Sequence, residues 1–348
     1  MSTQHLSAIR QTLRNVLNEI AAQTACDVES LLQKLTLRPP KNPGWGDLCT
    51  NVVLLICADE KEAHDKYGPE FTTQFEKLDF IQSATVSDNG YINLKIKPDY
   101  WASQLFDICR DGVGYCMGDR VPAIDTFVAL KPANTDDLVS LRQRWNVEAL
   151  SNLARQVGTD VTEGEWQAGE QRGFSLKGAL AKCGEQKLKL ALLSSGPDFA
   201  VKFSPIMATE QSYDNPAFSF LYAMSRIDAL LVQFSEDEKE EDGALLLEGH
   251  EDIKLTLRLE VELSKLLCHS PIYVRKALEE GDMNYLTSFL QSVTLLFFRL
   301  YRHERLQSSD YLGQEGHKNA RKLLLKAVNT QIGNSLKLMG IDRAKEFI

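Results

Sequence analysis

The sequence predicts an α+β segment at the N-terminus, a short α/β segment in the middle and an all-α helical bundle at the C-terminus. Two alternating apolar runs flank Asp88-Asn89-Gly90, which is typical of a β-hairpin. A short apolar run at 126–130 lies between helical stretches, and nearly every segment from Ser212 onward has helical periodicity. We place the boundaries of the three segments at 1–118, 119–204 and 205–348.

The first segment begins with helices. Apolar residues recur at helical spacing in an amphipathic first helix, and Asp27 is placed to cap a second. Three prolines between residues 39 and 43 predict an extended turn. The small and apolar run from Leu48 to Ala58 then predicts another helix packed inward. The stripe of the first helix consists of Ile9, Leu13, Val16, Leu17 and Ile20.

The second and third segments differ in their periodicity. In the middle, a strand at 126–130 precedes helical stretches at 138–156 and 176–193. The run from Glu236 to Asp252, with nine acidic residues and one lysine, predicts a solvated loop. Two leucine-rich stripes beyond it predict a helical bundle. One contains Leu255, Leu259, Leu263, Leu266 and Leu267, and the other Leu323, Leu324, Ala327, Val328, Ile332 and Leu336.

Composition argues for a globular protein. Hydrophobic residues make up 43% and charged residues 25% of the 348 residues. The apolar run Leu290–Leu300 is too short to span a membrane, and the N-terminus lacks the pattern of a secretory signal, so we expect a cytoplasmic protein. The seven scattered cysteines predict neither a disulfide framework nor a metal site, and most should be buried.

Charge is distributed unevenly along the chain. The net charge is −9, which is unfavourable for binding an acidic polymer. Residues 254–348 nevertheless carry 15 basic and 10 acidic residues, a balance of +5, and residues 1–253 carry 24 basic and 38 acidic residues, a balance of −14. The basic C-terminal third can therefore form a local electrostatic surface for a polyanion.

Residues 43–55 read Pro-Gly-Trp-Gly-Asp-Leu-Cys-Thr-Asn-Val-Val-Leu-Leu. They resemble the Gly-Asp-x-x-x-Asn-Val-Ala-Leu signature in the N-terminal domain of arginyl-tRNA synthetases, and Gly90-Tyr91-Ile92-Asn93 is similar to a strand of that domain. The resemblance implies contact with the tRNA elbow, where an exposed aromatic side chain can stack on a base. The alternative is that the Gly-Asp pair only forms a turn and a helix cap. The elbow candidates are Trp45, Gly46, Asp47 and Asn51.

Residues 210–227 resemble the entry to the same family's anticodon-binding domain, known as the DALR domain. Tyr222, Ala223 and Arg226 match its Tyr-Ala-x-x-Arg helix, and residues 338–341 resemble its Leu-Leu-Gly-Ile ending. Aromatics interleaved with basic residues follow, a pattern that suits unpaired RNA bases. Core packing for the aromatics and a solvated face for the basic residues are the alternatives. The anticodon candidates are Tyr222, Arg226, Phe298, Arg299, Tyr301, Arg302, Arg305, Arg321, Lys322 and Lys326.

The catalytic motif of the family is degenerate in this chain. Where the family has His-Ile-Gly-His after a strand, this sequence has Val139, Ser140, Leu141 and Arg142, so both histidines and the glycine are absent. The second nucleotide motif, rich in lysine, is matched only by residues 169–176. About 28 residues separate Arg142 from Glu170, too few for a complete nucleotide-binding sheet. The middle segment thus resembles a reduced remnant of the catalytic fold.

The resemblance implies a non-catalytic protein that binds tRNA, with arginine tRNA as the first candidate. It would contact the tRNA at the elbow and at the anticodon loop. Its role would be that of an adaptor or regulator of tRNA modification or charging. Possible partners are a tRNA-modifying enzyme or a complete synthetase, and no cofactor or metal is implied. One alternative is a degenerate or split arginine-tRNA ligase, in which Arg142 and Arg172 replace the lost groups. The other is a protein-interaction module that does not bind RNA.

Overall fold

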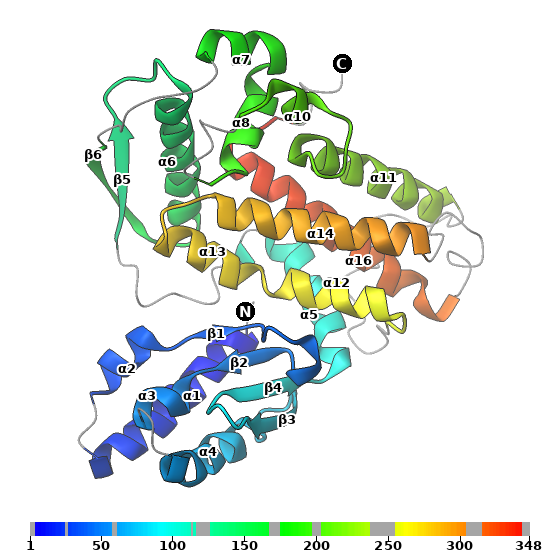
Figure 1. The fold of residues 1–348 in the computed structure, drawn as a ribbon. Helices are drawn as coiled ribbons and strands as arrows, with labels where there is room; N and C mark the ends of the chain where they lie inside the picture. Colours follow the sequence, from blue (N-terminus) through cyan, green and yellow to red (C-terminus); the bar gives the residue numbers. More distant parts are fainter. Residues whose placement is uncertain are drawn as a thin grey trace. The chain divides into compact units, whose positions relative to one another are not determined.

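The computed structural model describes residues 4–24, 27–57, 61–112, 114–115, 126–166, 175–196, 203–236, 255–303 and 315–342 (Figure 1). They form two compact units, the first ending at Trp101 and the second beginning at Ala102. The division into three domains stays a prediction. The predicted acidic loop beyond Glu236 lies outside the described residues. In the parts described here, no helix is both long and apolar enough to cross a membrane.

The helices of the first unit follow the predicted patterns. Helix α1 (Gln4–Thr24) buries its whole predicted stripe, from Ile9 to Ile20, at 2% exposure or less, which confirms it. Helix α2 (Val28–Lys34) begins as expected: the Asp27 carboxylate accepts a hydrogen bond from the backbone N–H of Ser30 at 3.3 Å. Helices α3 (Val52–Cys57) and α4 (Lys61–Phe75) complete this layer.

The first unit is built on a four-stranded antiparallel sheet. Its order is β1 (Leu37–Arg38), β2 (Leu48–Thr50), β4 (Ile92–Ile96), β3 (Ile81–Val86), and β3 and β4 form the predicted hairpin. The prediction of a helix from Leu48 was wrong at its start, because residues 48–50 pair with β4 and the helix begins only at Val52. Local apolar content did not distinguish a short buried strand from a helix.

The second unit begins with the end of α5 (Pro98–Asp111) and a β-α-β element. Strand β5 (Thr126–Pro132) and helix α6 (Leu138–Gln156) confirm the predicted strand and helix. Strand β6 (Asp160–Trp166), which the sequence did not predict, lies parallel to β5 with Phe127 opposite Val161. Residues 160–165 of this strand are mostly polar and are half-buried or exposed, so its apolar pattern is weak.

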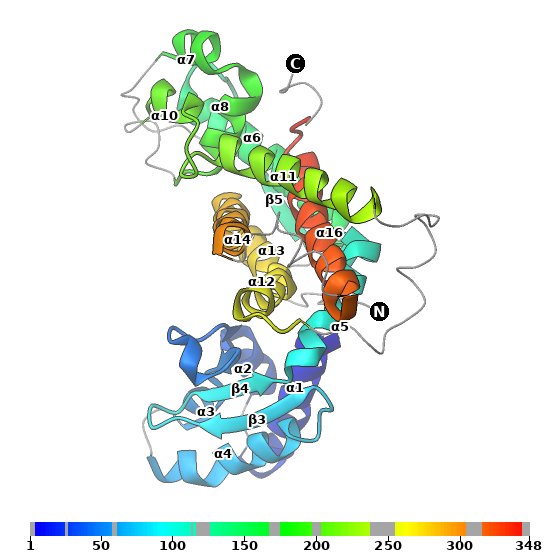
Figure 2. The same ribbon diagram turned by 90° about the vertical axis from the view of Figure 1, so that its right-hand side faces the viewer.

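In the described part of the second unit, five helices form a bundle: α11 (Pro216–Glu236), α12 (Arg258–Cys268), α13 (Ser270–Glu279), α14 (Asn284–His303) and α16 (Glu315–Leu338). Helices α11 and α12 each pack against α14 and α16 (Figures 1 and 2). The predicted stripe of α16 is buried throughout. In the other stripe, Leu263 and Leu267 are buried, whereas Leu255 precedes the helix.

Shorter helices connect the β-α-β element to the bundle. The predicted helix at 176–193 is two helices, α7 (Leu176–Cys183) and α8 (Glu185–Leu193), because Gly184 interrupts it with φ 72°. Helix α10 (Pro205–Thr209) leads to α11. Helix α6 packs on α8, α13 and α16 as well as on β5, so the β-α-β element and the bundle share one interior.

Candidate nucleic-acid interface

An aromatic cluster lies between the start of α11 and the end of α14. The rings of Phe218 and Tyr222, one helical turn apart on α11, are stacked with centroids 5.1 Å apart and an interplanar angle of 13°. Tyr222 stacks on Phe298 of α14 at 5.7 Å, and Tyr213 lies 4.5 Å from Phe298. Phe298 is buried, whereas the other three side chains are half-buried. The cluster therefore offers partly accessible aromatic groups supported by a buried one.

Guanidinium groups lie over these rings. The Cζ of Arg226 is 4.7 Å from the ring centroid of Tyr222, and the Cζ of Arg302 is 4.7 Å from that of Tyr213. Arg299 and Arg302 are exposed. Burial raises the pKa of the Tyr301 hydroxyl, and the charge of Arg226 partly offsets this. Aromatic faces beside cations are the groups that unpaired bases and phosphates require.

Other anticodon candidates face the interior of the bundle. Arg321 is 1% exposed, and its Nε donates to Oε1 of the fully buried Glu260 at 2.8 Å. Lys322 is 8% exposed and Lys326 is half-buried. Arg305 lies outside the described residues. Arg321 is thus paired inside the bundle, and sequence periodicity gave no sign of the carboxylate that pairs with it.

The elbow candidates around the Gly-Asp motif have structural roles. Asp47 is 9% exposed, and its Oδ2 accepts a hydrogen bond from the backbone N–H of Ile96 at 2.7 Å. Gly46 has φ 150°, and a Cβ there would lie 2.7 Å from the carbonyl oxygen of Leu94. Asn51 accepts from the N–H of Thr36 at 2.8 Å and donates to a second backbone group. These contacts support the alternative interpretation of the motif as a turn, since they hold β2 to its neighbours.

Trp45 differs from its neighbours because its side chain is 56% exposed. It lines a cavity of about 500 Å³ together with Tyr91 and the basic residues Arg38 and Lys41. The two loops after β1 and β3 also contribute, the latter through Asn89. The Trp45 cavity thus combines two aromatic groups with two cations and the carboxylate of Asp88. Sequence reasoning missed Arg38 and Lys41, although both flank the proline turn that positions Trp45.

The degenerate motif forms the first turn of α6. Ser140 is held by Asp137, whose carboxylate caps the helix by accepting from the backbone N–H and hydroxyl of Ser140, both at 2.8 Å. Leu141 is buried and Val139 half-buried. Arg142 is 8% exposed and donates to the carbonyl oxygens of Leu192 and Ser195 and to the carboxylate of Asp282. All four side chains are therefore part of helix capping or packing.

Among the described residues, no group of three or more His, Cys, Asp or Glu side chains could hold a metal ion. The second degenerate segment, residues 169–176, is described only from Ser175 onward, where the serine hydroxyl caps α7. Arg172 lies outside the described residues. The candidate interface thus consists of two sites, one in each unit: the aromatic cluster and the Trp45 cavity.

Two family models match the chain. The model of the arginyl-tRNA synthetase N-terminal domain matches residues 7–96, and that of the DALR anticodon binding domain matches residues 220–346. A protein of Nitrobacter winogradskyi named arginine–tRNA ligase is 29% identical over 134 residues, or 38% of this chain and 22% of that protein. A protein of Salinibacter ruber with the same name is 29% identical over 243 residues, or 68% of this chain and 36% of that protein.

These matches span about a fifth to a third of the relatives' own length. The crystal structure of arginyl-tRNA synthetase from Plasmodium falciparum has a similar fold, with a TM-score of 0.65 and 8% identity. That similarity covers 97% of this chain and 98% of the solved chain. With both domain models matched in order and this fold shared, the chain is an arginyl-tRNA synthetase-like protein.

Proposed function

We propose that this protein binds tRNA without aminoacylating it, and that arginine tRNA is its first candidate. Residues 1–118 would contact the elbow through the Trp45 cavity, and residues 205–348 would contact the anticodon loop. The observation that carries the proposal is the aromatic cluster, whose rings are covered by Arg226 and Arg302. Tyr222, Arg226, Phe298 and Arg302 of this cluster are within residues 220–346, which match the DALR anticodon binding domain.

The contacts of the middle segment support a role without catalysis. The guanidinium of Arg142 is committed to two backbone carbonyls and to Asp282, so it is not directed at an external ligand. The described part of residues 119–204 contains one β-α-β element, whereas a doubly wound nucleotide-binding fold has about five or six parallel strands. We propose that this segment is a reduced remnant of the catalytic fold that serves as a spacer.

A spacer between two RNA-binding sites suits an adaptor. When one chain holds two sites on the same ligand, the second contact forms at a high effective concentration, provided that the spacing fits. We therefore propose that the protein presents tRNA to a tRNA-modifying enzyme or to a complete synthetase. Co-purification from cells, followed by sequencing of the bound RNA, would identify both the tRNA and the enzyme.

Gel-shift titration of the full chain with arginine tRNA and with an unrelated tRNA, at several salt concentrations, tests the proposed binding. Arg302→Glu should weaken arginine tRNA binding by about tenfold to a hundredfold, since a contact to a charged group contributes about 1.5–3 kcal/mol. Arg258→Glu is the matched control: Arg258 is on α12, its side chain is 89% exposed, and it pairs with Glu262 one turn away on the same helix. Equal effects of the two variants would argue against the aromatic cluster.

Trp45 provides the corresponding test in the first unit. Trp45→Ala should weaken binding by about 1–3 kcal/mol, the contribution of one stacked base, and Trp45→Phe should restore much of it. Because Trp45 is largely exposed, neither variant should change the melting temperature appreciably. Unchanged affinity in Trp45→Ala would remove the Trp45 cavity from the interface.

The ligase alternative is favoured by the names of the relatives, which are arginine–tRNA ligases. ATP–pyrophosphate exchange with arginine tests it directly, and measurable turnover would overturn the proposal of a non-catalytic protein. A chain that binds neither tRNA, at any salt concentration, would instead favour the protein-interaction module.

A further inference from the structure

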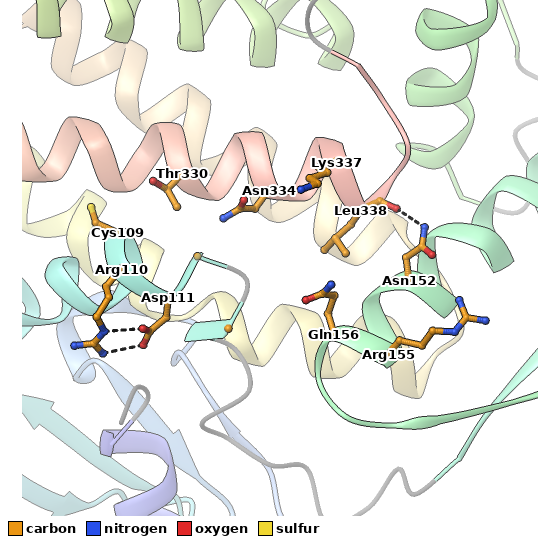
Figure 3. Close-up of a pocket in the computed structure, with 12 residues that line it drawn as sticks. Cys109, Arg110, Asp111, Asn152, Arg155, Gln156, Thr330, Asn334, Lys337 and Leu338 are labelled. Carbon is orange, nitrogen blue, oxygen red and sulfur yellow. Dashed lines mark hydrogen bonds and ion pairs between the residues drawn. The ribbon is translucent and has the colours of Figure 1, made fainter.

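A polar cavity of about 610 Å³ lies where three helices of the second unit end (Figure 3). Helix α5 ends at Asp111, α6 at Gln156 and α16 at Leu338, and all three residues line the cavity. Its volume is within the range of about 300–1,000 Å³ that is usual for small-molecule sites. Neither the aromatic cluster nor the Trp45 cavity shares a lining residue with it.

Two cations at this cavity are not committed to a partner. Arg155 and Lys337 are exposed, and within the described ranges neither side chain has a hydrogen bond or ion pair. The pKa of the Glu163 carboxyl is lowered mainly by its hydrogen bond to Lys131, and the more distant charge of Arg155 lowers it further by a smaller amount. Arg110 differs, because it is paired with Asp107 and Asp111 at 2.6 Å each.

Amide side chains line the same cavity. Gln156 and Asn334 project into the space between α6 and α16 (Figure 3), and their amide groups have no hydrogen-bond partner among the residues the structure describes. Asn334 approaches the backbone of Gly112 so closely that a Cβ there would lie 2.4 Å from its Nδ2. Gly112 has φ 56°, so glycine suits this position both in conformation and in space. An amide offers a donor and an acceptor, which match the edge of a nucleobase.

The cavity is separate from the degenerate catalytic motif. Arg142 and Gln156 are both on α6, fourteen residues apart, which corresponds to about 21 Å along the helix. The motif residues are at the opposite end of α6 and are buried or used in capping. A ligand in this cavity would therefore not occupy the position that corresponds to the lost catalytic site.

A purely structural role for the cations is the competing explanation. A helix C-terminus carries about half a negative charge, which basic residues in the last turn offset. Arg110, Arg155 and Lys337 are each in such a turn. This explanation accounts for the cations, but not for the unbonded amides of Gln156 and Asn334 or for the space between them.

We propose that this cavity binds one phosphorylated nucleotide unit, with its phosphate on Arg155 and Lys337 and its base or sugar on the amides of Gln156 and Asn334. The nucleotide is either free or part of a bound RNA, and in the second case the inference rests on the proposed tRNA binding. A nucleotide fits because it joins an anionic phosphate to a planar group with donors and acceptors, and the lining residues offer partners for both.

Titration of the full chain with AMP by isothermal calorimetry tests the cavity without RNA. Arg155→Ala and Lys337→Ala should each weaken AMP binding about tenfold, the effect of losing a hydrogen bond to a charged group. Arg144→Ala, on the same helix, is the matched control, because Arg144 is exposed and pairs with Glu148 away from the cavity lining. It removes the same charge and should leave AMP affinity unchanged.

Gel shifts with arginine tRNA distinguish the two sources. If RNA supplies the nucleotide, Arg155→Ala and Lys337→Ala should weaken tRNA binding and lower the slope of log affinity against log salt by about 1 each. If the nucleotide is free, AMP should bind while tRNA affinity stays unchanged in both variants. A third outcome is that the chain binds AMP, that this binding depends on Lys337, and that the chain binds no tRNA. This outcome would support a nucleotide site in this cavity and would contradict the proposed tRNA binding.

Two results would overturn the inference. One is that the unmodified chain shows no AMP binding and that Arg155→Ala and Lys337→Ala bind tRNA as well as Arg144→Ala does. The other is that these variants lower only the melting temperature and leave both affinities unchanged, which would assign the cations to the helix ends alone.

Discussion

Arg142→Met tests whether the degenerate catalytic motif has become structural. The substitution keeps most of the side-chain volume but removes the donors to the carbonyl oxygens of Leu192 and Ser195, at 2.6–3.1 Å, and to Asp282 at 2.9 Å. In the variant, the carboxylate of Asp282 still accepts a hydrogen bond from the backbone N–H of Asn284, and its side chain is 20% exposed, so it keeps one partner and some contact with solvent. Breaking a buried pair costs about 3–5 kcal/mol, and we expect the lower end, about 3 kcal/mol.

Chemical denaturation and hydrogen exchange measure this effect. We expect a lower free energy of unfolding and faster exchange in α6, in the end of α8 and in the turn between α13 and α14, because Arg142 joins these three places. Arg144→Met, two residues away, removes an exposed pair with Glu148 and should cost about 0.5 kcal/mol or less.

Two outcomes would refute the structural interpretation of Arg142. The first is that Arg142→Met unfolds with the same free energy as the unmodified chain. The second is that the unmodified chain exchanges ATP and pyrophosphate with arginine and that Arg142→Met abolishes this exchange while keeping its stability. That result would make Arg142 a functional replacement for a lost catalytic group.

Three further predictions concern stability and reactivity. Arg321→Met should cost about 3–5 kcal/mol, since it removes the guanidinium that pairs with the fully buried Glu260. Arg321→Met with Glu260→Leu should recover part of this loss in a denaturation double-mutant cycle. Gly46→Ala should lower the melting temperature of the first unit, because its Cβ would meet the carbonyl oxygen of Leu94 at 2.7 Å; an unchanged melting temperature would contradict the geometry. Burial raises the pKa of the Cys109 thiol to about 12, and the thiolate is the reactive form, so iodoacetamide at pH 8 should modify Cys109 far more slowly in the folded chain than in the denatured chain. Equal labelling in both, measured by mass spectrometry, would contradict this.

Elements with a long periodic pattern were predictable from the sequence. The stripes of α1 and α16 and the bounds of α6 follow from apolar spacing, since a helix that packs on one side must repeat every three to four residues. Strands β2 and β6 were not predictable. Leu48–Thr50 is too short to show alternation, and β6 is mostly polar, so both are strands because of the partners with which they pair.

The residues of the candidate interface were likewise predictable only in part. Residues with aromatic or basic side chains could be listed from their types, and Tyr222, Arg226 and Arg302 do meet in one cluster. That Arg321 is buried was not predictable, because its partner Glu260 is 61 residues earlier in the chain. Arg38 and Lys41 likewise became candidates only when the turn brought them to Trp45.

The sequence by itself determined the family resemblance and the order of helical and strand-forming segments, and it showed that residues 139–142 contain no histidine, because these features depend on residue identity and on local spacing. The tertiary structure decided which side chains remain available to a ligand. Burial and pairing depend on residues far apart in the chain, so the same basic residue type is a buried ion-pair partner at position 321 and an exposed group over an aromatic ring at position 302.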